Sequence, residues 1–179
     1  MGYPMTRITT SRLVDVPATV AWDVVTDHAL YAEVAPNPAE VAVVDGEGVG
    51  LVRRCVDADG NEWTESCTRW DEGRGFAVAV DVENSAFHRR LLTRFEGEWR
   101  VAERPTGTLV TVRFEFDPRF GPLGVLVSRD VERRARGPVA AVLDGWEAEM
   151  TARAADAADA ASGADGTPAG ASRDGGGTR

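Results

Sequence analysis

Three segments between residues 76 and 116 alternate between apolar and polar side chains, and a long helical pattern follows them. Alternation predicts strands with one buried face, and short connections between such strands predict an antiparallel meander. From Leu123 to Met150 the apolar residues instead keep helical spacing, which predicts an amphipathic helix with one face on the sheet. The chain is therefore predicted to be an α+β protein. The residues predicted to lie on the buried face of the three strands are Phe76, Val78, Val80 and Val82; Phe95, Gly97, Trp99 and Val101; and Val110, Val112, Phe114 and Phe116.

The first part of the chain adds two short helices and three more strands. Pro17 ends a first strand and suits the first turn of a helix, and Asp27 can cap a second helix that ends before Pro36. A glycine run at 46–50 is followed by a strand, whereas a dinucleotide-binding loop needs a helix there, so it is predicted to be a hairpin loop. The predicted strands are 7–15, 40–45 and 49–57, and the predicted helices are 18–26 and 28–34.

The 179 residues suit a single domain, predicted at 7–155. Residues 1–6 are predicted to be flexible. Residues 156–179 are rich in Gly, Ala and Asp with little to bury, so they are predicted to be disordered. Gly137-Pro138 is predicted to kink or break the long helix, because proline removes a helix hydrogen bond.

Charge and composition exclude several classes of function. The net charge is −9 and no lysine is present, which excludes Schiff-base chemistry and P-loop phosphate binding. The acidic balance argues against a nucleic-acid partner. Two cysteines, no apolar leader and no membrane-span-length apolar run predict a cytoplasmic protein without a disulfide. His28 and His88 lack metal-ligand spacing with the cysteines, so neither a metal nor another cofactor is expected.

The segment from Glu62 to Asp71 places charged residues on an inward strand face. Side chains on a strand point alternately to its two faces, so one face carries Trp63, Glu65, Cys67 and Arg69. The residues between them are small and carry hydroxyl groups, which suits a face exposed to water. A buried unpaired charge costs several kcal/mol, so the interior is either a solvated pocket or holds a charge pair. A two-residue turn at Asp59-Gly60 would place Arg54 opposite Glu65.

Each candidate site residue has a functional and a structural interpretation. Arg54, Glu65 and Arg69 would orient a ligand carbonyl or enol, or form an ion pair that braces a hairpin. His88 would be a general base or a solvated loop residue, and Cys67 is expected to be a small buried apolar group. The aromatic residues would stack on planar rings or simply fill the core; they are Trp63, Trp99, Phe76, Phe95 and Phe114.

The order of elements and six motifs resemble the polyketide cyclase/dehydrase branch of the START and Bet v 1-like superfamily, over about residues 7–150. The motifs are Pro-Ala-Thr-Val-Ala-Trp-Asp-Val-Val-Thr-Asp (17–27), Gly-Val-Gly (48–50), Asp-Gly-Asn-Glu-Trp-Thr-Glu (59–65), Trp-Asp-Glu-Gly-Arg (70–74), Gly-Glu-Trp-Arg-Val (97–101) and Gly-Thr-Leu-Val-Thr (107–111).

The resemblance implies a helix-grip fold, in which a curved antiparallel sheet of about seven strands grips the long C-terminal helix around a ligand cavity. It also implies a pocket lined by Trp, Tyr and an inward Arg. The residues expected to carry chemistry are Arg69, Glu65 and Tyr31. Those expected to contact the ligand are Trp63, Arg54, Cys67, Phe76, Val78, Phe95, Trp99, Phe114 and His88.

Three functions follow from the resemblance. The first is cyclisation and dehydration of a hydrophobic or carrier-protein-bound polyketide, as in antibiotic biosynthesis, without metal or redox cofactor. The second is a non-catalytic carrier or sensor for a hydrophobic ligand or lipid. The third is a protein-interaction module of the toxin or quinone-chaperone type. The expected oligomeric state is a monomer or homodimer.

Overall fold

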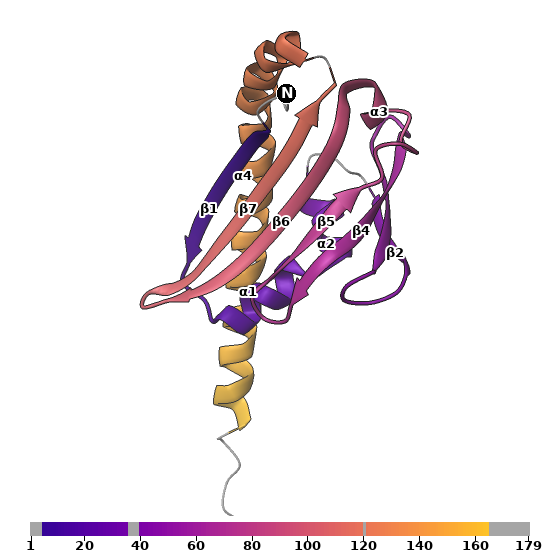
Figure 1. The fold of residues 1–179 in the computed structure, drawn as a ribbon. Helices are drawn as coiled ribbons and strands as arrows, with labels where there is room; N and C mark the ends of the chain where they lie inside the picture. Colours follow the sequence, from indigo (N-terminus) through magenta and orange to yellow (C-terminus); the bar gives the residue numbers. More distant parts are fainter. Residues whose placement is uncertain (1–4, 36–39, 120, 165–179) are drawn as a thin grey trace, which may run out of the picture.

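A seven-stranded antiparallel sheet curves along one long helix in the computed structural model, which describes residues 5–35, 40–119 and 121–164 (Figure 1). The strand order across the sheet is β1-β7-β6-β5-β4-β3-β2. This architecture confirms the predicted α+β helix-grip fold. The elements in chain order are β1 (Thr6–Val14), α1 (Ala18–Val25), α2 (His28–Val34), β2 (Glu40–Asp45), β3 (Val52–Val56), β4 (Glu62–Asp71), β5 (Gly75–Val80), α3 (His88–Leu91), β6 (Leu92–Arg104), β7 (Gly107–Pro118) and α4 (Gly121–Ala164).

Local signals place the two short helices as predicted. Pro17 directly precedes α1, and the Asp27 side chain accepts a hydrogen bond from the Leu30 backbone N–H at 3.1 Å, which caps α2. The glycine run lies between β2 and β3, where Gly46, Gly48 and Gly50 have positive φ. It is therefore a hairpin loop, as predicted.

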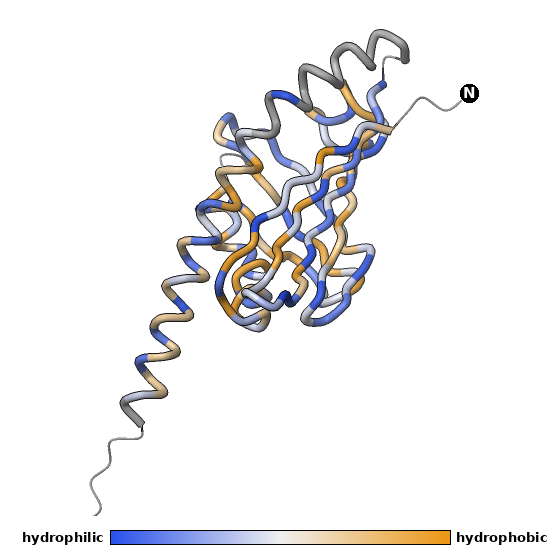
Figure 2. Tube along the Cα trace, turned by 90° about the vertical axis from the view of Figure 1, so that its left-hand side faces the viewer, coloured by the Kyte–Doolittle hydropathy of each residue, from blue (hydrophilic) through white to orange (hydrophobic). Residues whose placement is uncertain are grey.

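Helix α4 departs from two predictions. A kink or a break was predicted at Gly137-Pro138, and the helix is continuous through Pro138, so the break is wrong. It also continues to Ala164 and extends past the sheet (Figure 2), so the predicted disorder is wrong for residues 156–164. Alanine has the highest intrinsic helix propensity, which explains why an exposed Ala-rich segment continues the helix. Residues 1–4 and 165–179 lie outside the described part of the chain, and Thr6, predicted to be flexible, begins β1.

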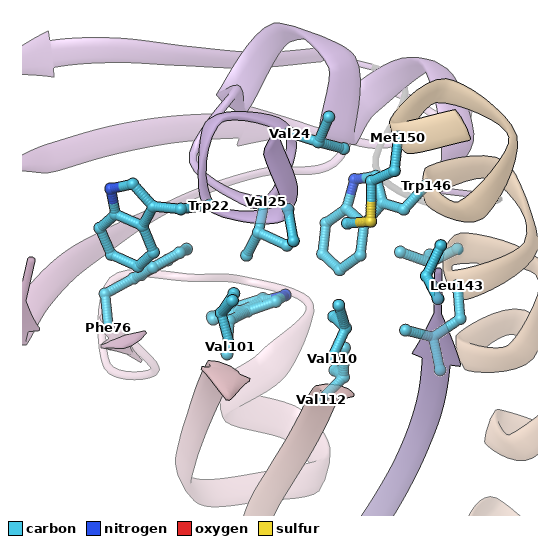
Figure 3. Close-up of a cluster of buried hydrophobic side chains, with 14 of the residues drawn as sticks. Trp22, Val24, Val25, Phe76, Val101, Val110, Val112, Leu143, Trp146 and Met150 are labelled. Carbon is cyan, nitrogen blue, oxygen red and sulfur yellow. The ribbon is translucent and has the colours of Figure 1, made fainter. Parts of the chain in front are cut away.

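One end of the interior between sheet and helix is solidly packed. Figure 3 shows side chains from α1, the sheet and α4 meeting there, and Trp146 and Met150 of α4 are at most 1 % exposed. The described part of the α4 face predicted to be apolar is therefore confirmed as core. Its buried residues are Val139, Val142, Leu143, Trp146 and Met150.

The β3–β4 hairpin has a register one residue away from the predicted one. The backbone N–H of Gly60 donates to the Asp57 carbonyl, and Gly60 has φ +81°. The loop therefore holds three residues closed by a left-handed glycine, instead of a two-residue turn. As a result Arg53, not Arg54, lies opposite Glu65, and Arg54 lies opposite Thr64. The prediction for Arg54 is wrong.

Of the four β4 side chains predicted to point inward, the first three do so and the fourth does not. Trp63, Glu65 and Cys67 are buried, but a register shift between Cys67 and Arg69 carries the Arg69 side chain to the outer face. There it is 49 % exposed and forms an ion pair with Glu98. The prediction that Arg69 points inward is therefore wrong.

Candidate functional site

A buried ion pair between Arg53 and Glu65 lies at the centre of the site. The Arg53 Nε and Nη2 atoms donate to Glu65 Oε2 at 2.7 and 2.6 Å, and Trp63 Nε1 donates to Glu65 Oε1 at 2.9 Å. The Arg53 side chain is 2 % exposed and that of Glu65 is 11 % exposed. Both oxygens of Glu65 are therefore occupied, which makes it a positioning group for Arg53.

Two aromatic rings cover the Arg53 guanidinium. Its Cζ lies 5.4 Å from the Tyr31 ring centroid and 5.1 Å from that of Trp99. A guanidinium within about 6 Å of a ring face is attracted by the ring quadrupole, more so when water is excluded. Burial alone would lower the pKa of Arg53, but Glu65 and its other neighbours raise it overall. The site therefore holds a permanent cation beside two adjacent rings.

His28 completes the surroundings of Arg53. Its Nδ1 lies 3.1 Å from Arg53 Nη1, so the ring accepts a hydrogen bond there, since a guanidinium only donates. Burial, then the charge of Arg53, lower the pKa of His28 to about 4. His28 is therefore neutral at physiological pH and holds the guanidinium in place.

This arrangement makes stability depend on pH. Between pH 6.5 and about 4 the unfolded chain protonates His28 while the folded chain does not, so the free energy of unfolding falls as the pH falls through this window. The expected loss is roughly 2–3 kcal/mol, at about 1.4 kcal/mol per unit of pKa difference. His28→Asn keeps an acceptor beside Arg53 but cannot titrate. Urea denaturation at several pH values measures the free energy of unfolding, which should depend less on pH in this variant than in the unmodified protein. The same dependence on pH in both proteins would contradict the assignment.

Neither cysteine is activated for chemistry. Burial, then Glu65, raise the pKa of the Cys55 thiol, and burial raises that of Cys67. Both are free thiols, and Cys67 donates to the Arg69 carbonyl at 3.2 Å. Cys67 is therefore a small buried side chain, as predicted.

His88 lies inside the protein instead of in solvent. It begins α3, its ring contacts those of Trp63 and Phe95 with centroids 5.2 and 5.7 Å apart, and its Nδ1 lies 2.8 Å from Ser85 Oγ. Burial lowers its pKa, so the ring is neutral near pH 7. The interpretation as a solvated loop residue is wrong, and a neutral buried imidazole of this kind can accept a proton.

An aromatic surface on the inner side of the sheet is only partly covered. Phe95 and Phe114 share the inward parity of buried neighbours yet are half-buried, as is Tyr31 of α2. Their rings approach one another or Trp99, with centroids 5.8–5.9 Å apart. We call Tyr31, Phe95 and Phe114, together with Trp99, which is itself buried, the inner aromatic surface. It borders the charged pair, so one face offers planar rings next to a fixed guanidinium.

Gly97 makes room for this surface. A Cβ added there would lie 2.7 Å from Trp99 Cη2 and 3.1 Å from Phe114 Cε1. Gly97→Ala is therefore expected to displace the Trp99 ring and to lower the free energy of unfolding by about 1–3 kcal/mol. Gly137→Ala, an exposed helix position, is the control and should change the free energy of unfolding by less than about 1 kcal/mol, because the gain in helix propensity is offset by the restriction that Pro138 places on a Cβ before it. Chemical denaturation of both variants tests this difference, and equal effects would contradict it.

The structure brings most of the predicted site residues together and separates two of them. Phe76 stacks on Trp99 with ring centroids 4.9 Å apart, and Val78 is buried beside it. Arg54 and Arg69 lie on the outer side, where Arg54 pairs with Glu40 and Glu62. The residues gathered on the inner side are Trp63, Glu65, Cys67, Phe76, Val78, His88, Phe95, Trp99, Phe114 and Tyr31.

Sequence reasoning missed Arg53, His28 and Trp146 as parts of this region. A three-residue turn at 58–60 would have put Arg53 opposite Glu65, and the shared parity of Arg53 and Cys55 is visible in the sequence. For His28 the only signal was its position at the start of α2. Trp146, whose ring centroid lies 5.9 Å from that of Tyr31, was expected only as a core residue.

Within the described residues no group of three or more His, Cys, Asp or Glu side chains is placed to hold a metal ion. Among the described helices none is long and apolar enough to cross a membrane.

Comparisons with known proteins agree on family and fold. Residues 5–151 match the family model described as polyketide cyclase/dehydrase and lipid transport. A sequence search of curated proteins finds no match.

Solved structures with the same fold include two kinds of enzyme. The ZhuI aromatase/cyclase from Streptomyces sp. R1128 is 22 % identical, with TM-score 0.66 over 84 % of this chain and 96 % of that one. Norcoclaurine synthase from Thalictrum flavum is 16 % identical, with TM-score 0.66 over 86 % and 98 %. The di-domain aromatase/cyclase BexL, from the BE-7585A biosynthetic pathway, is 22 % identical, with TM-score 0.62 over 82 % of this chain and 50 % of that one.

Proposed function

Because the chain belongs to the polyketide cyclase/dehydrase and lipid transport family, we propose that its inner aromatic surface binds a hydrophobic or polyaromatic molecule that carries carbonyl groups. The observation that carries this proposal is the Arg53 guanidinium, held by Glu65 and His28 beside the half-buried ring of Tyr31. Rings stack on planar ligands, and a fixed cation favours a carbonyl or enolate oxygen. A plain core would require neither the buried charge nor incompletely covered aromatic residues.

The reaction that this arrangement suits is cyclisation followed by dehydration of a poly-β-ketone. A base removes a proton from a methylene between two carbonyls, and the resulting carbanion forms a carbon–carbon bond to a third carbonyl carbon. The new alkoxide takes up a proton, and the hydroxyl and a neighbouring proton then leave as water. A fixed cation that stabilises the intermediate enolate contributes about 3–4 kcal/mol in comparable oxyanion sites.

Named residues fill these roles in the proposal. Arg53 replaces Arg54 and Arg69 as the cation of the site, where it acts on the ligand through its charge because its side chain is only 2 % exposed, and Glu65 keeps Arg53 in position. Burial raises the pKa of Tyr31, so its hydroxyl stays protonated and can donate to the alkoxide. Neutral His88, beside Trp63 and Phe95, is the candidate base. A carrier-protein-bound chain is the proposed substrate form.

Tyr31→Phe tests this assignment because it removes one hydroxyl and keeps the ring. Turnover of a poly-β-ketone substrate is expected to fall about 10²-fold, the usual contribution of a proton donor, while binding changes little. Binding is measured by quenching of tryptophan fluorescence with a hydroxylated anthraquinone, since Trp99 borders the proposed site. Arg69→Gln on the outer face is the control and should keep both turnover and binding.

A second function, a non-catalytic carrier for the same kind of ligand, uses the same surface without proton transfer. It is favoured by Glu65, whose two oxygens are already occupied by Arg53 and Trp63. Binding without turnover by the unmodified protein would support the carrier and overturn the cyclase. Mass spectrometry of small molecules that copurify with the protein would identify the ligand class in either case. If neither binding nor a copurified ligand is found, both functions are wrong.

A further inference from the structure

The outer face of the sheet, opposite the inner aromatic surface, carries a group of arginines that the proposed function does not use. They come from four strands and surround two carboxylates. We call this group the outer-face arginine cluster; its members are Arg7, Arg69, Arg100 and Arg113, with Glu98 and Glu115.

The strand register brings these side chains together. Arg113 of β7 lies between Thr9 of β1 and Glu98 of β6, while the next position along the outer face pairs Thr111 with Arg100. The surface is hollowed at this point, with a volume of about 310 Å³. The hollow is lined by Arg7, Thr9, Glu98, Arg100, Thr111 and Arg113.

The two carboxylates orient the arginines without neutralising them all. Glu98 receives hydrogen bonds from Arg69, Arg100 and Arg113, with Arg100 Nε at 2.6 Å. Partial burial by itself would raise the pKa of Glu98, but the hydrogen bonds from Arg100 and Arg69 outweigh it and leave the pKa below its usual value. Four guanidinium groups against two carboxylates leave an excess of two positive charges, although the chain as a whole has a net charge of −9.

The cluster also has more donors than its carboxylates use. Each guanidinium carries five N–H donors, and Arg7 donates to Glu115 through Nε at 2.7 Å. The Arg7 and Arg100 side chains are 52 % and 62 % exposed, so the remaining donors of these two residues are accessible. Arg113 lines the hollow, and its Nε is buried and has no hydrogen-bond partner in the described part of the chain. The hydroxyl of Thr9 adds a donor at the same place, whereas that of Thr111 shares a hydrogen bond with Ser11 Oγ at 2.9 Å.

We propose that this hollow is a binding site for a doubly charged phosphate group, either inorganic phosphate or a phosphate monoester. A dianion matches the two excess charges, and guanidinium forks fit phosphate oxygens with paired hydrogen bonds. The carboxylates Glu98 and Glu115 keep the forks oriented before the ligand arrives, which reduces the entropy lost on binding. The site lies on the other side of the sheet from the inner aromatic surface and is independent of the proposed function.

Titration of the full chain with inorganic phosphate and with phenyl phosphate, each against chloride at equal ionic strength, tests the site by calorimetry. Arg7→Gln combined with Arg100→Gln removes two accessible forks and should weaken phosphate binding by at least about tenfold. Arg74→Gln combined with Arg104→Gln removes the same charge from exposed positions outside the hollow. This control should change affinity by less than about twofold, the effect of general screening.

The two phosphate probes distinguish the sources of the group. Tighter binding of phenyl phosphate assigns the hollow to an organic monoester, and equal binding assigns it to the phosphate group alone; both support the site. Binding no stronger than that of chloride, or equal losses in the two double variants, would overturn it. A circular dichroism spectrum and a denaturation curve of each variant show that the fold is retained.

Discussion

Glu65→Leu is expected to lower the free energy of unfolding by about 3–5 kcal/mol, because it leaves the Arg53 guanidinium buried without its counter-ion. The substitution also removes the acceptor of the Trp63 indole N–H. Urea denaturation followed by tryptophan fluorescence measures the change. If the slope of the free energy of unfolding against urea concentration is unaltered, the substitution has changed stability and not the compactness of the unfolded chain.

Two further variants make this prediction specific. Arg69→Leu breaks an exposed ion pair on the other face of the sheet and should cost about 0–1 kcal/mol. Arg53→Met combined with Glu65→Leu replaces both charges by apolar groups of similar size, and should recover most of the stability lost in Glu65→Leu. If Glu65→Leu costs no more than Arg69→Leu, the pair is not held in an environment that excludes water.

Trp146→Ala is expected to cost about 3–5 kcal/mol, since the side chain is 1 % exposed and joins α4 to the rest of the core. It faces residues of α1 and the sheet (Figure 3), so its removal opens a cavity at their junction. Thr151→Ala, at an exposed position of the same helix, is the control and should stay within about 0.5 kcal/mol of the unmodified protein. Thermal and urea unfolding of both variants tests the difference.

The indole N–H of Trp146 adds a second test. It is buried and has no hydrogen-bond partner among the described residues. Trp146→Phe therefore removes no hydrogen bond and should cost less than about 2 kcal/mol, clearly below Trp146→Ala. Equal losses for Phe and Ala would show that the indole nitrogen contributes an interaction that the structure does not contain.

The sequence predicted that a charged pair lies on the inner face of the sheet, but not which arginine forms it. The inward parity of Trp63, Glu65 and Cys67 follows from alternation, because side chains on a strand alternate between the two faces. The identity of the counter-ion depends on register, and one residue of slippage exchanges Arg53 for Arg54. The register follows from the three-residue loop that Gly60 closes in the left-handed conformation. A two-residue turn at Asp59-Gly60 looks equally favourable in the sequence.

Arg69 and His88 show two other limits of the sequence. A β-bulge after Cys67 reverses the parity of Arg69, and the alternating pattern contains no signal for it. The flanking arginines of His88 suggested solvent, yet the first turn of α3 places the ring against Trp63. Local polarity therefore did not reveal that Ser85 and His88 of this segment would be buried.

The sequence by itself determined the alternation of the strands, the helical period from residue 139 to 150, the capped helix α2 and, through the order of these elements, the helix-grip fold. These features depend on neighbours a few positions apart, where the geometry of strands and helices is the same in every protein. Only the tertiary structure decided which guanidinium faces Glu65, that His28 and two rings surround it, and that four arginines gather on the opposite face. Those contacts join strands and helices that are far apart in sequence, so a shift of one residue in a turn or bulge changes them all.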